Sequence, residues 1–108
     1  MKSTSYAALA FAGVLATSAP AQAEPAPGLA LAQQQNCMSC HSVNRPFMGP
    51  ALHDVADKYA SRADAETYLA HKIIDGSTGI WGQVPMPANT QLTPDQAAIL
   101  ASWILTLK

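Results

Sequence analysis

Segment 37–41, which reads C-M-S-C-H, constrains this chain more than any other stretch. It contains both cysteines of the chain, with two residues between them, and a histidine follows the second cysteine directly. Two thiols on one turn of backbone can each add to a vinyl group along one edge of a porphyrin, and the next residue then offers an imidazole to the iron. The run has the form of a covalent haem attachment motif. It predicts one haem c bonded to Cys37 and Cys40, with His41 as a metal ligand.

Two other uses of this cysteine pair are open. A dithiol redox pair would need a thioredoxin-like βαβ context, and no strand pattern flanks this one. A zinc site would need a second ligand pair at a suitable spacing, which His53 and His71 do not supply. Haem attachment is therefore the interpretation we favour.

The first 23 residues have the organisation of a secretory signal peptide. Lys2 supplies a positive start, residues 6–16 are an apolar run, and residues 21–23 form an A-x-A cleavage site. An uncleaved membrane anchor is the alternative, but a span needs about 20 apolar residues. We expect residues 1–23 to be the signal peptide and residues 24–108 to be one small domain in the periplasm, without stable membrane insertion.

The predicted mature chain is small and weakly charged. Loss of Lys2 leaves five basic and seven acidic residues, a net charge of −2. There is no basic stripe, so nucleic acid is not an expected partner. A chain of 85 residues buries a thin core on its own, and a buried haem would supply the missing apolar mass.

Apolar spacing predicts an all-α fold of about four helices. The first helix, residues 28–36, runs into Cys37 with Leu29 and Ala32 on its buried face and Leu31 on another side. The second covers residues 52–60. The third runs to Asp75, with Asp64 as its N-cap and Gly76 as its C-terminal stop. The residues expected on the buried sides of the second and third helices are Leu52, Val55, Ala56, Tyr59, Tyr68, Leu69, Lys72 and Ile73.

The last helix has the clearest start signal. Thr93 is a candidate N-cap, Pro94 stands at the first helical position, and Gln96 completes a capping box. Its expected apolar side consists of Ile99, Leu100, Trp103, Ile104 and Leu107.

The long loop 76–91 offers a second iron ligand. Loops of this length in a compact domain are usually functional. Met86 lies between Pro85 and Pro87, whose rings restrict the backbone on either side of it. Met38 lies inside the attachment segment, too close to reach the face of the haem opposite His41. Met48 is better placed on the same face of the haem as His41. Methionine and histidine together are an electron-transfer ligand set, although Met86 could also serve only to pack the loop.

Four stretches together resemble the small class I bacterial cytochromes c of the c8, or c-551, type. They are segments 37–41, 48–50 (M-G-P), 76–82 (G-S-T-G-I-W-G) and 85–89 (P-M-P-A-N). The resemblance covers essentially all of the predicted mature chain.

The resemblance implies roles for matching positions. His41 and Met86 would be the axial ligands, and the Pro50 carbonyl would accept the His41 ring N–H. Trp81 would donate to a haem propionate, and Asn89 would hold the Met86 loop. Lys72 stands where the family often has an arginine near the same propionate, a change that keeps the charge but loses the two-pronged donor.

The function implied is single-electron transfer by a non-enzymatic monomer that docks transiently on redox partners. By resemblance these would be a quinol-oxidising complex and a terminal reductase or oxidase, such as nitrite reductase. A haem protein with an open sixth site for peroxide or gas is the rival class, and a haem module docked permanently on a larger enzyme is a third. We expect His53 and His71 to be surface histidines, and Asp57, Lys58 and Arg62 to form a solvated face.

Overall fold

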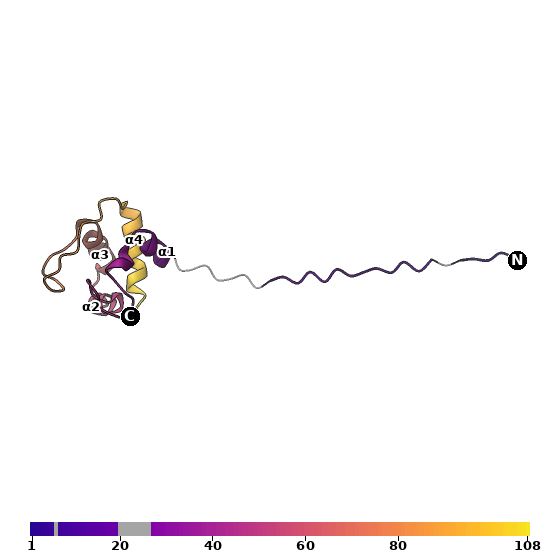
Figure 1. The fold of residues 1–108 in the computed structure, drawn as a ribbon, viewed down its shortest axis with the longest axis horizontal. Helices are drawn as coiled ribbons and strands as arrows, with labels where there is room; N and C mark the ends of the chain where they lie inside the picture. The colour runs from indigo at the N-terminus through magenta and orange to yellow at the C-terminus, as the bar shows by residue number, and fades with distance from the viewer. Residues whose placement is uncertain (6, 20–26) are drawn as a thin grey trace.

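The computed structural model describes residues 1–5, 7–19 and 27–108. The predicted cleavage site at residues 21–23 therefore lies outside the described residues, as do residues 24–26. Four α-helices and one 3₁₀ turn are present in the described chain: α1 Pro27–Gln34, η1 Cys37–Ser39, α2 Leu52–Tyr59, α3 Ala65–Asp75 and α4 Pro94–Leu105. The prediction of an all-α fold with about four helices is confirmed (Figure 1). No helix in the described ranges is long and apolar enough to cross a bilayer.

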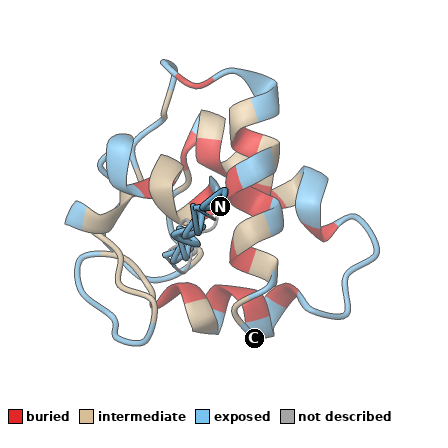
Figure 2. Cartoon of the chain, turned by 90° about the vertical axis from the view of Figure 1, so that its right-hand side faces the viewer, coloured by how far each residue is buried: buried red, intermediate tan, exposed pale blue. Residues whose placement is uncertain are grey.

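Helix α4 is the centre of the domain, because α1, α2 and α3 all pack against it. Figure 2 shows the buried segments of these helices turned toward one another. The core that they enclose consists of small and medium apolar side chains: Ala32, Leu52, Val55, Tyr59, Ala65, Leu69, Ile73, Leu92, Ala97, Leu100, Ala101 and Ile104.

The start of α4 is as predicted, and part of its buried face is not. The Thr93 hydroxyl accepts from the Gln96 N–H at 3.2 Å, and the Gln96 side chain accepts from the Thr93 N–H at 3.0 Å. Ile99, expected on the apolar side, is 44% exposed. Leu107 lies beyond the end of the helix, although it packs against the core. Alanines take part of the face instead, since the absence of a long side chain lets neighbouring helices approach α4 closely. The buried residues of α4 are Ala97, Leu100, Ala101 and Ile104.

Helix α1 ends before the attachment motif, which corrects the predicted helix over 28–36. It stops at Gln34, and Asn36 has φ +61°, in the left-handed region where an α-helix cannot continue. Leu29 and Leu31 are both only partly buried, and Leu31, expected on another side of the helix, packs against the core. A Cβ at Gly28 would overlap the Trp103 ring, so this glycine lets α1 cross α4.

Helix α2 follows the predicted pattern, and α3 follows it in part: Leu69 and Ile73 are buried, whereas Tyr68 and Lys72 are only partly buried. All four apolar residues expected on the buried side of α2 are buried. Gly76, with φ +73°, ends α3 as predicted. Asp64 occupies the N-cap position of α3, but its carboxylate pairs with Arg62 and makes no capping hydrogen bond.

Two residues of the predicted solvated face, in and just after α2, contact aromatic rings. The Lys58 ammonium lies 4.5 Å from the centre of the Trp81 ring, and the Arg62 guanidinium carbon lies 3.7 Å from that of Tyr68. His71 is exposed, as predicted. His53 is only partly exposed, and it contacts both Asp57 and the carbonyl of Leu107.

Candidate haem site

The two cysteines lie on one tight turn. The N–H groups of Cys40 and His41 both donate to the Cys37 carbonyl, at 3.2 and 3.0 Å. The Ser39 hydroxyl donates to the Asn36 carbonyl at 2.7 Å, which adds a side-chain hydrogen bond to the turn. Both thiols are free and only partly exposed.

The His41 ring is oriented by the loop that follows it. Its Nδ1 lies 2.8 Å from the Pro50 carbonyl oxygen. A carbonyl can only accept, so Nδ1 carries the proton, and Nε2 keeps a lone pair for a metal. A Cβ at Gly49 would lie 2.6 Å from Cε1 of the imidazole, so the glycine lets backbone and ring lie in contact.

A largely apolar cavity of about 190 Å³ opens beside the His41 ring. A neighbouring cavity of about 310 Å³ is also lined by Cys40, His41 and Met86, so the two adjoin. Cys37 lines the second cavity. Two thiols, one imidazole and one thioether thus surround a hollow walled mainly by apolar side chains, and this donor set fits a covalently attached haem.

The loop that carries Met86 is fastened to the end of α3. Met86 and Ser77 exchange backbone hydrogen bonds of 2.8 and 3.1 Å, which form an isolated antiparallel bridge. Asn89 donates its backbone N–H to the Ile74 carbonyl at 3.0 Å and its side-chain amide to the Ile73 carbonyl at 2.9 Å. These acceptors are among the last carbonyls of α3, which have no partner within the helix.

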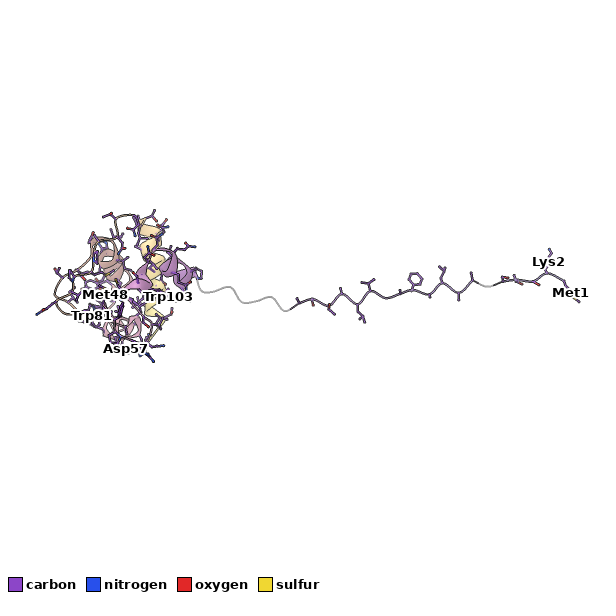
Figure 3. The ribbon with its side chains drawn as sticks, in the orientation of Figure 1. Met1, Lys2, Met48, Asp57, Trp81 and Trp103 are labelled. Carbon is purple, nitrogen blue, oxygen red and sulfur yellow. The ribbon has the colours of Figure 1, made fainter. Side chains whose placement is uncertain are left out.

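The other two predicted site residues also line the first cavity. Lys72 is partly buried, with its ammonium 5.5 Å from the centre of the Tyr68 ring. Trp81 is 40% exposed, and its ring meets that of Tyr59 edge-on, with centroids 6.5 Å apart. Figure 3 shows Trp81 on the same side of the domain as Met48, which lines this cavity too.

The structure disfavours the two alternative uses of the cysteines, a redox dithiol and a zinc site. Burial raises the pKa of the Cys37 thiol, whereas a redox-active dithiol needs a lowered one. In the described part of the chain, no three His, Cys, Asp or Glu side chains gather as a metal site would require. This leaves the zinc interpretation without a ligand set.

Sequence reasoning gave no role at the site to three residues that shape it. Gly49 and Gly76 accommodate His41 and the Met86 loop, and Lys58 contacts Trp81. The glycines had a detectable signal, since Gly49 belongs to segment 48–50 and Gly76 begins segment 76–82. Lys58 had none, because its contact is between residues far apart in the chain.

Residues 25–108 match the family model of cytochrome c. The chain belongs to the cytochrome c family. Cytochrome c-552 of Nitrosomonas europaea is 55% identical over 78 residues, which are 72% of this chain and 76% of that protein. Cytochrome c-551 of Stutzerimonas stutzeri is 44% identical over 108 residues and the full length of both chains. The crystal structure of wild-type Nitrosomonas europaea cytochrome c552 covers 74% of this chain and 99% of its own, with a TM-score of 0.73 and 54% identity.

These matches confirm the resemblance to the small class I cytochromes c and their fold. They also confirm the cofactor: as a cytochrome c with a single cysteine pair, this chain carries one covalent haem c and is an electron carrier.

Proposed function

We propose that this cytochrome c carries single electrons in the periplasm, with His41 and Met86 as the two axial ligands of its haem iron. The observation that carries the proposal is that both side chains line the same cavities as Cys40, although they stand 45 positions apart in the sequence. When bound, the haem supplies a reversible one-electron couple at its iron. A retained pair of protein ligands suits that chemistry, because no substrate need enter the coordination sphere.

Each neighbouring residue has a distinct task in this proposal. Cys37 and Cys40 attach the haem by thioether bonds, and the Pro50 carbonyl holds the His41 imidazole in one orientation and tautomer. Asn89 ties the Met86 loop to α3, which limits the motion of a weak thioether ligand. Trp81 and Lys72 supply an N–H donor and a positive charge at the cavity, where haem propionates would need both.

An apolar surface at the mouth of the first cavity is the proposed docking surface for redox partners. Met48, Trp81 and Val84 line that cavity, and they are 55%, 40% and 59% exposed; Phe47, next in sequence to Met48, is 71% exposed. Exposed apolar groups of this kind suit brief contacts of small area between a monomer and its partners. We propose a quinol-oxidising complex as donor and a terminal oxidase or reductase, such as nitrite reductase, as acceptor. Residues 1–23, as a signal peptide, would direct the chain to the periplasm.

Met86→Ala tests the ligand assignment. The wild-type ferric protein should be six-coordinate and low-spin and show the weak sulfur-to-iron band of a thioether ligand. The variant should lose this band, bind carbon monoxide more readily, and have a lower reduction potential, because sulfur disfavours the ferric state.

Met48→Ala is the matched control, since Met48 is a second methionine lining the same cavity. It should keep the sulfur band. A wild-type protein that is already high-spin and binds carbon monoxide freely would refute the assignment and favour an open sixth site. Loss of the band in Met48→Ala alone would mean that Met48 is the ligand.

A further inference from the structure

The loop between Ser77 and Met86 depends on side chains for its attachment to the domain. Residues 78–85 make no backbone hydrogen bond to any part of the described chain. Gly79 and Gly82, with φ +75° and +124°, add backbone freedom inside this segment. Trp81 lies at its centre and makes the aromatic and cationic contacts that join the segment to α2.

Two consecutive residues of α2 contact the Trp81 ring. The Lys58 ammonium lies 4.5 Å from the ring centroid, within the range of a cation–π interaction. The Tyr59 ring packs edge-on against the same indole, at an interplanar angle of 75°. Tyr59 is buried in the core, whereas Lys58 is exposed. The indole thus contacts one buried ring and one exposed ammonium, and this ammonium also lies 5.8 Å from the centre of the Tyr59 ring.

We propose that Lys58 is a positioning residue for the haem environment, which acts by clamping Trp81 and, through it, segment 78–85. Trp81 and Val84 both line the first cavity, so the segment forms part of its wall. The Lys58 charge lies beside the indole that lines this cavity. A positive charge there favours the reduced, less positive iron. This inference rests on the proposed function only in assigning Trp81 to a propionate. The clamp itself is a contact between residues of the chain.

Lys58→Met tests the clamp, because methionine keeps a similar unbranched stem and removes the charge. An exposed cation–π contact of about 0.5–1 kcal/mol corresponds to an about two- to five-fold change in an equilibrium. In the ferrous holoprotein, solvent exchange of the Trp81 indole N–H should therefore accelerate by about that factor. The amides of α4, which are hydrogen-bonded within the helix, should exchange at the wild-type rate. The reduction potential should fall.

Lys58→Arg and Lys108→Met are the matched variants. Arginine also stacks on an indole, so Lys58→Arg should restore slow exchange and the wild-type potential. Lys108→Met removes an exposed charge at the chain end, and indole exchange should stay at the wild-type rate. Unchanged exchange in Lys58→Met would overturn the proposal. If Lys58→Met and Lys108→Met shift the potential equally and have equal rates of indole N–H exchange, Lys58 acts only through the net charge of the protein, and the proposal is wrong. The sulfur band reports separately on Met86 ligation, so a failed clamp and a failed ligand assignment give different results.

Discussion

Replacement of Gly76 by alanine should weaken the attachment of the Met86 loop more than any other single-methyl addition in this region. Gly76 has φ +73° and ψ −174°, a backbone region that is essentially restricted to glycine. A Cβ there would overlap the Met86 carbonyl oxygen and lie 2.8 Å from the Ala88 nitrogen. Both atoms are backbone, so neither can move aside without shifting the loop.

Two separate costs determine the size of the effect. The disfavoured backbone conformation should cost about 1–3 kcal/mol. Overpacking against backbone should cost a further 1–3 kcal/mol or so. A total of about 2–6 kcal/mol compares with the roughly 5–15 kcal/mol by which a small domain is stable. The least costly relaxation is to break the Ser77–Met86 bridge, so we expect a folded holoprotein whose Met86 is loosely held.

Gly79→Ala separates the two costs. Gly79 has a similar φ of +75°, but a Cβ there would have no neighbour within 4 Å. Denaturant unfolding of the holoproteins should show a larger loss for Gly76→Ala than for Gly79→Ala. The sulfur-to-iron band should weaken only in Gly76→Ala. Equal losses of stability in the two variants, with the band intact in both, would refute the reasoning.

Two further predictions concern the histidines. Gly49→Ala should push the His41 imidazole away from the Pro50 carbonyl, because the added methyl group would overlap the ring. The free energy of unfolding should fall by about 1–3 kcal/mol. An unchanged NMR resonance of the His41 ring N–H in the ferrous protein would contradict this prediction. The Leu107 carbonyl, and after it the charge of Asp57, raise the pKa of His53 above 6.5. The protonated ring therefore stabilises the fold fully below pH 6.5, and this contribution is lost as the pH rises through the folded-state pKa. The stability advantage of the wild type over His53→Gln should shrink over that range, and an NMR titration of His53 should give a midpoint above 6.5. An advantage that grows with pH would show that the sign is wrong.

The sequence alone determined the features that depend only on residues close together in the chain. Helix α4 could be placed from its capping box, because both hydrogen bonds of the box join Thr93 and Gln96, which are three positions apart in the chain. The end of α3 followed from Gly76, since few other residues adopt its backbone conformation. The cysteine spacing pointed to the cofactor before any fold was known, because thioether attachment needs only one turn of chain.

Tertiary structure alone decided which side chains meet across the domain. Ile99 and Leu31 have similar hydrophobicity, yet one is exposed and the other packs on the core, because burial depends on where neighbouring helices lie. Similarly, Lys58 is one of several charged residues on an amphipathic helix until the fold places Trp81 over it. His53 makes its strongest contact with Leu107, a residue more than 50 positions away. Local sequence does not predict such contacts, since each joins segments that only the folded chain brings together.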